Sequence, residues 1–183
     1  MNPMASDATS SPSPVSYSTP NQAALAGIKF TSTFGQIVLV LMRTRQHRHS
    51  FLGDLEWLVM PAVTNSQFML AEHRDGSTGL AMPLATVLWA QVSEEVDARL
   101  SANPDQRVRL KPEEWTSGTI PWLIEAVGET RAVGTLLRRL IDERFPATGV
   151  KSIGRSPDGT AKVRVLRKEA AESGASQEPP HRH

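Results

Sequence analysis

Apolar residues recur along this chain with spacings that predict helices in some segments and strands in others. Residues 130–145 carry the 3-, 4-, 7- and 8-residue spacing of one helix face, in Val133, Leu136, Leu137, Leu140 and Ile141. Pro146 then ends this helix, because proline lacks the N–H that the next turn needs. A second helix is expected over residues 34–44. A third begins after Ser93, whose side chain is a favoured N-cap, and continues to about Leu100.

The remaining apolar segments have the length and the turn residues of strands. Asp75-Gly76 predicts a turn between two of them, and Pro157-Asp158-Gly159 predicts another near the C-terminus. Pro83 indicates an edge strand or a β-bulge, because proline cannot donate a hydrogen bond within a sheet. Residues 102–112 are polar and contain proline, so a loop is expected there. The predicted strands cover residues 55–63, 67–73, 80–90, 121–127, 150–155 and 161–167.

This order of elements predicts a single α/β (α+β) domain in which helices flank a mixed sheet. The domain is expected to span residues 27–168. Residues 1–26 are rich in Ser, Pro, Thr and Ala, and residues 169–183 in Gly, Ser, Pro and charges. Both compositions favour disorder, because little apolar surface can be buried. His181 and His183 are interpreted as solvated side chains, with weak metal binding as the alternative.

Composition excludes several classes of protein. The chain has 183 residues and no cysteine, which excludes disulfides, thiolate nucleophiles and thiolate metal sites. A formal net charge of +1 provides no basic field for nucleic acid. The longest strongly apolar run, residues 37–42, is far shorter than the roughly 20 residues of a membrane span. Because the N-terminus also lacks the basic region of a secretory signal, we expect a cytoplasmic protein without a membrane span.

Two titratable residues are candidates for acid–base chemistry. His47 lies among arginines, so it is either a general base or one side chain of a solvated basic segment. Glu125 interrupts an apolar strand, where a carboxylate is costly unless it is paired. It either forms a salt bridge with an arginine at the rim or orients a histidine, as carboxylates do in hydrolase triads. Ser117 is a candidate acyl acceptor, although its segment also has the features of a structural turn.

These residues belong to an ordered set with fixed intervals. Pro61-Ala62-Val63 begins fourteen residues after His47. The other members are Gly35, Gln67-Phe68, the block from Pro83 to Trp89-Ala90-Gln91-Val92-Ser93, Glu114-Trp115-Thr116-Ser117-Gly118 and Arg144-Phe145-Pro146. The set covers residues 34–167 and resembles the toxin-activating lysine acyltransferases, the family of the haemolysin activator of RTX toxins.

The resemblance implies a fold similar to the GNAT acetyltransferases, with a mostly antiparallel sheet. It implies transfer of a fatty acyl group from acyl carrier protein (ACP) to internal lysines of an RTX-type protoxin, by a homodimer. The family's essential histidine falls on His47, and its catalytic aspartate falls on Glu125. Two further positions differ, because Leu58 stands where the family has asparagine and Thr44 where it has serine.

No cofactor or metal is expected beside acyl-ACP as co-substrate. The segment most similar to a Gly-rich coenzyme A loop, residues 131–137, is a poor match, which favours a carrier protein as the donor. The candidate docking residues for acidic ACP are basic: Arg138, Arg139, Arg144, Lys151, Arg155, Lys162, Arg164 and Arg167. Two other functions remain open: a GNAT-like acyltransferase acting on another protein or an amine, and a catalytically impaired protoxin-binding protein.

Overall fold

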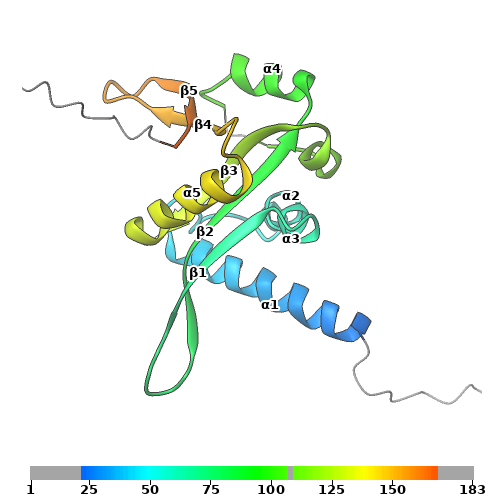
Figure 1. Ribbon diagram of the computed structural model, residues 1–183, viewed down its shortest axis with the longest axis vertical. Coiled ribbons are helices and arrows are strands. Elements are labelled where there is room, and N and C mark those ends of the chain that lie inside the picture. Colours follow the sequence, from blue (N-terminus) through cyan, green and yellow to red (C-terminus); the bar gives the residue numbers. More distant parts are fainter. Residues whose placement is uncertain (1–21, 107–108, 169–183) are drawn as a thin grey trace, which may run out of the picture.

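One mixed sheet forms the centre of the protein, with helices on both faces (Figure 1). The computed structural model describes residues 22–106 and 109–168. In this part the strands lie side by side in chain order: β1 (Phe68–Arg74), β2 (Ala81–Val92), β3 (Ile120–Gly128), β4 (Val150–Arg155) and β5 (Ala161–Leu166). Neighbouring strands are antiparallel except β3 and β4, which are parallel. The mixed α/β fold is confirmed and is consistent with a GNAT-like architecture.

The helices pack on the sheet through two separate cores. They are α1 (Gln22–Arg43), α2 (Asp54–Leu58), α3 (Met60–Thr64), α4 (Glu94–Ala102), the 3₁₀ helix η1 (Pro112–Thr116) and α5 (Thr130–Arg144). Leu88, Ala90 and Val92 of β2 face one core with α1 to α4 and η1. Ala85, Val87 and Trp89 of the same strand face the other core with α5. Because successive side chains of a strand point to opposite faces, β2 serves both cores.

Most predicted elements are found close to their expected positions. Ser93 caps α4 by accepting a hydrogen bond from the Val96 N–H, and α5 ends one residue before Phe145. The two predicted hairpins are β1–β2 and β4–β5. Pro83 lies at a β-bulge, where the pairing of β1 with β2 shifts after Ala71.

The strand predicted over residues 55–63 is wrong, because α2 and α3 occupy this segment. Its exposed residues, Glu56, Met60 and Thr64, recur every fourth position, and the residues between them are largely buried. That period belongs to a helix, but a short apolar run does not distinguish the two structures by composition alone. Pro61 lies in the first turn of α3, where its fixed φ fits a helix.

Helix α1 is longer than the helix predicted over residues 34–44, and it begins before the expected domain boundary at residue 27. Its C-terminal half packs into the core through Ile37, Val40 and Leu41. Within the described residues, Ala23–Arg43 is the single helix long and apolar enough to cross a membrane by length and composition. A core helix of a globular protein meets the same criteria. The expectation of no membrane-length helix rested on the apolar run 37–42 alone.

Candidate active site

His47 and Glu125 form a contact between segments that are 78 residues apart in the chain. Nε2 of His47 lies 2.8 Å from Oε2 of Glu125, and their side chains are 1% and 12% exposed. The predicted pairing of this carboxylate with the histidine is therefore found, and among residues 22–106 and 109–168 no arginine forms a salt bridge with Glu125. The imidazole is not part of a solvated surface, although Arg45, Arg48 and His49 around it are exposed.

The end of α1 places the imidazole. The Thr44 hydroxyl donates to the carbonyl of Leu41 at 2.7 Å, and the backbone N–H of His47 donates to the carbonyl of Thr44 at 3.3 Å. The chain therefore leaves the helix in a tight turn over residues 44–49. This turn directs His47 back toward the sheet, with the neighbouring arginines left in solvent.

A β-bulge directs Glu125 toward His47. The pairing of β2 with β3 shifts between Leu88 and Trp89, so that Ile124 has no partner on β2. Trp122 and Val127 face the same core although they are five positions apart, and in a regular strand positions an odd number apart face opposite sides. The extra residue puts Glu125 on the face that α1 covers, and bulges commonly re-aim a side chain in this way.

The hydrogen bonds indicate which nitrogen of a neutral His47 carries the proton. Oε1 of Glu125 accepts a hydrogen bond from the Ala126 N–H at 3.1 Å, and Oε2 contacts His47. Because an ionised carboxylate only accepts hydrogen bonds, a neutral His47 carries its proton on Nε2. Its other nitrogen, Nδ1, lies 3.4 Å from the Ser50 hydroxyl.

A cavity of about 430 Å³ lies where the parallel strands β3 and β4 diverge. These strands share the single register pair Trp122↔Lys151 and separate beyond it. Glu125 lines the cavity, whereas His47 lies behind the carboxylate. The other lining residues are Gln46, Trp57, Leu58, Pro104, Asp105, Gln106, Leu123, Ile124, Ala126, Ser152, Ile153 and Arg155. Leu58, at the position where the resemblance implies asparagine, gives this wall an apolar side chain.

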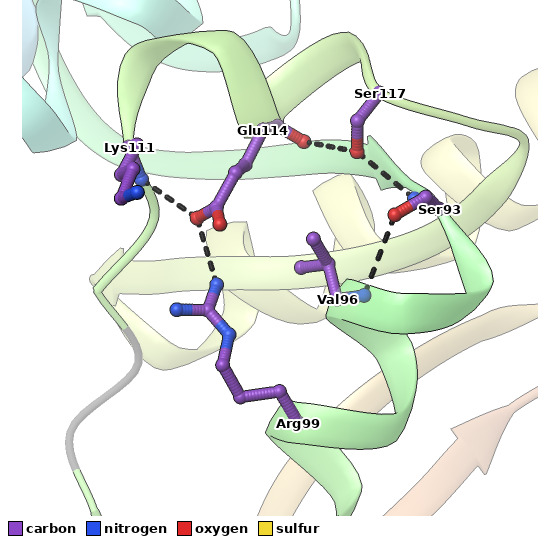
Figure 2. A network of polar contacts seen from close by, with 6 residues as sticks. All are labelled: Ser93, Val96, Arg99, Lys111, Glu114 and Ser117. Atoms are coloured by element: carbon purple, nitrogen blue, oxygen red, sulfur yellow. Dashed lines mark hydrogen bonds and ion pairs between the residues drawn. The ribbon is translucent and has the colours of Figure 1, made fainter.

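The motif Glu114-Trp115-Thr116-Ser117-Gly118 is a structural turn (Figure 2). The Ser117 hydroxyl accepts from the Ser93 N–H at 2.9 Å and donates to the Glu114 carbonyl at 3.0 Å. Trp115 is fully buried. A Cβ on Gly118 would lie 2.7 Å from Cα of Ser93, so a side chain does not fit there. The predicted turn and the predicted packing role of Trp115 are confirmed. The Ser117 hydroxyl uses its two hydrogen bonds to link the turn to Ser93, the N-cap of α4.

Glu114 anchors this turn to the loop before it and to α4. Its carboxylate accepts from the Lys111 N–H at 2.8 Å and from the Arg99 guanidinium at 2.7 Å (Figure 2). Burial raises the pKa of Glu114, but these donors outweigh burial and hold the pKa below its ordinary value. The carboxylate is therefore a structural anion rather than a proton acceptor.

The remaining sequence candidates do not join the pair of His47 and Glu125. Residues 131–137 lie inside α5 and do not form a phosphate-binding loop. Lys151 donates to Asp97 at 2.7 Å, and Arg139 pairs with Glu143, so these two cations already have partners. Within residues 22–106 and 109–168, three or more His, Asp or Glu side chains do not gather as a metal site. His181 and His183 lie outside the described residues.

Sequence reasoning did not find Ser50 or the cavity. Ser50 follows His47 by three residues, a spacing that a turn brings within reach, and this was the available signal. The cavity depends on the divergence of β3 and β4, which no residue pattern in the sequence predicts.

Comparison with known proteins reveals one family. Residues 27–169 match the model of the RTX toxin acyltransferase family. The chain is 30% identical over 100 residues to a leukotoxin-activating lysine-acyltransferase of Pasteurella haemolytica-like sp. (strain 5943B), covering 45% of this chain and 55% of that protein. It is 28% identical over 115 residues to an RTX-II toxin-activating lysine-acyltransferase of Actinobacillus pleuropneumoniae, covering 63% and 66%. The aligned part thus spans between about half and two thirds of these relatives.

Proposed function

The chain belongs to the RTX toxin acyltransferase family, and from that premise we propose that it is a protein-lysine fatty acyltransferase. In this proposal the acyl donor is acyl-ACP and the acceptor is an internal lysine of an RTX-type protoxin. The observation that carries the proposal is the contact of His47 with Glu125 beside the cavity between β3 and β4.

A lysine amine needs a base before it can attack a thioester. With an ordinary pKa of about 10.4, roughly 0.1% of lysine side chains are neutral near pH 7.4. A histidine accepts a proton in this pH range. His47 fills this role, and Glu125 stabilises the imidazolium that forms, as a carboxylate does in a hydrolase triad.

The reaction then proceeds without a covalent enzyme intermediate. One proton of the lysine ammonium moves to His47, and the neutral nitrogen attacks the carbonyl carbon of the thioester. As the new C–N bond forms and a second N–H proton is released to solvent, the C–S bond breaks. The imidazolium returns its proton to the departing thiolate. The products are the amide and the free thiol of the carrier.

The cavity between β3 and β4 is the candidate site for the acyl chain of the donor. Its apolar wall, with Trp57, Leu58 and Ile124, suits an acyl chain, because each buried methylene contributes about 0.8 kcal/mol. Arg138 and Arg144 on the exposed side of α5 suit an acidic carrier protein.

The test is intact-mass spectrometry of an RTX-type protoxin co-expressed with this protein or with its His47→Ala variant. We expect acyl-sized mass increases on lysine with the wild type and a loss of about 10²- to 10⁴-fold in rate with the variant. The same modification with both proteins would remove His47 from the mechanism. Protoxin binding without any acylation would instead establish a non-catalytic partner.

A further inference from the structure

The basic lone pair of His47 points away from Glu125. The contact of Nε2 with the ionised carboxylate requires a proton on Nε2, so the lone pair of the neutral imidazole lies on Nδ1. With its side chain 1% exposed, the ring cannot meet an acceptor amine in solvent directly. A base in this position needs another group to connect Nδ1 with the acceptor.

Ser50 is the side chain in contact with Nδ1, at 3.4 Å. This distance is long for a hydrogen bond, but catalytic hydrogen bonds in unliganded sites are commonly long and shorten when substrate binds. Ser50 is half-buried, whereas the imidazole is enclosed and the next residue, Phe51, is exposed. Ser50 therefore contacts the base and is itself partly open to solvent.

The backbone holds Ser50 in this place from both sides. Its N–H donates to the carbonyl of His47 at 3.0 Å, which closes the turn around the imidazole. The next residue, Phe51, donates its N–H to Oδ2 of Asp54 at 2.9 Å, and the Asp54 N–H donates back to the Phe51 carbonyl at 2.9 Å. The position of the hydroxyl is thus set by the fold rather than by a free loop.

We propose that Ser50 carries the acceptor's proton to Nδ1 of His47, whose Nε2–H tautomer is fixed by Glu125. In this step an N–H bond of the lysine ammonium breaks as an O–H bond forms on Ser50. The original O–H bond of Ser50 breaks as the N–H bond on Nδ1 forms. The amine becomes neutral, His47 becomes imidazolium, and Ser50 is unchanged. This inference rests on the proposed function.

The first test needs no activity. ¹⁵N NMR of the histidine side chains, assigned with His47→Gln, reports which nitrogen of His47 carries the proton. We expect Nε2–H in the wild type, in Ser50→Thr and in Ser50→Ala, because Glu125 sets the tautomer, and a changed ¹⁵N chemical shift of Nδ1 in Ser50→Ala, because its hydrogen-bond donor is lost. A wild-type imidazole protonated on Nδ1, or an Nδ1 shift in Ser50→Ala identical to that of the wild type, would overturn the proposal.

The second test measures acyl transfer with Ser50→Ala, Ser50→Thr and the matched control His49→Ala, an exposed neighbour. We expect Ser50→Ala to lower kcat about tenfold with KM unchanged, as for the loss of one hydrogen bond, and the other two variants to keep kcat within about twofold. Full activity of Ser50→Ala contradicts the role of Ser50 alone, whereas an inactive wild type contradicts the proposed function. An acyl ester found on Ser50 would make it a nucleophile and overturn the proposal.

Discussion

Glu125 contacts His47 through a side chain that has one methylene more than the aspartate that the resemblance places there. The 2.8 Å contact is made with β3 in its observed position. A shorter carboxylate on the same backbone would end farther from the imidazole, so side-chain length can be tested separately from charge.

Glu125→Asp is expected to reduce the rate of acyl transfer by about 10²-fold, because a displacement of about 1 Å in an active site has costs of that order. The change retracts the carboxylate and leaves the charge in place. The measurement is kcat for protoxin acylation, with circular dichroism as the check on folding. If the variant kept wild-type kcat, the backbone of β3 would have to shift to restore the contact, and a structure of the variant would show it.

The contact of His47 with Glu125 could be predicted from the sequence because the types and intervals of the two residues match a family. The contact of Ser50 with Nδ1 could not, because serine is common on surfaces and its distance from Nδ1 depends on the turn over residues 44–49. At the scale of single residues, sequence thus identified chemistry but not orientation.

At the scale of elements, irregular backbone positions the site. The bulge at Ile124 places Glu125 on the face that α1 covers, and the divergence of β3 from β4 leaves the cavity. Neither feature changes the alternation of apolar residues enough to be predicted. The same ambiguity explains residues 55–63, where an apolar run was interpreted as a strand and forms two short helices.

The turn at Glu114 provides a test of element stability. Glu114→Gln removes the charge while keeping the shape, and we expect it to lower the free energy of unfolding at pH 7 by about 1 kcal/mol. Hydrogen bonds to a charged group contribute somewhat more than about 1 kcal/mol. Because Arg99 is 47% exposed, solvent screening weakens its contribution to the stability.

The pH dependence of this effect follows from the lowered pKa of Glu114. A lowered pKa stabilises the fold above the unfolded value of about 4.3, and the stabilisation is lost as pH falls through the folded pKa. The free energies of unfolding of Glu114→Gln and wild type, measured in urea, should therefore converge once the pH has fallen below the lowered folded pKa of Glu114. Glu113→Gln, at an exposed neighbour, serves as the control and should match wild type throughout. A constant difference at all pH values would contradict this account.

At the scale of the whole molecule, β2 contributes side chains to both cores. Helix α5 covers the face of the sheet opposite the face that α1 covers. The helix α5 presents Arg138 and Arg144 to solvent, whereas Arg139 is paired with Glu143. A formal net charge of +1 means that attraction to an acidic carrier depends on where charges lie and not on their sum.

Arg138→Glu is expected to raise KM for acyl-ACP about fivefold at low salt and to leave kcat unchanged, because surface charges act mainly on encounter. The matched control is Arg74→Glu, at the end of β1 in the hairpin that projects from the sheet (Figure 1). It makes the same change of charge away from α5 and should leave KM unaltered.

Two conditions separate docking from a structural effect of Arg138→Glu. Raising the ionic strength shortens the Debye length from about 10 Å at 0.1 M to about 3 Å at 1 M, so the difference between Arg138→Glu and wild type should shrink. A small acyl-pantetheine thioester lacks the acidic carrier surface, so its KM should be the same for both proteins. An equal increase of KM for the small donor would place Arg138 in the structure of the donor site rather than on a carrier-binding face. An equal increase with Arg74→Glu would show that net charge alone governs the encounter.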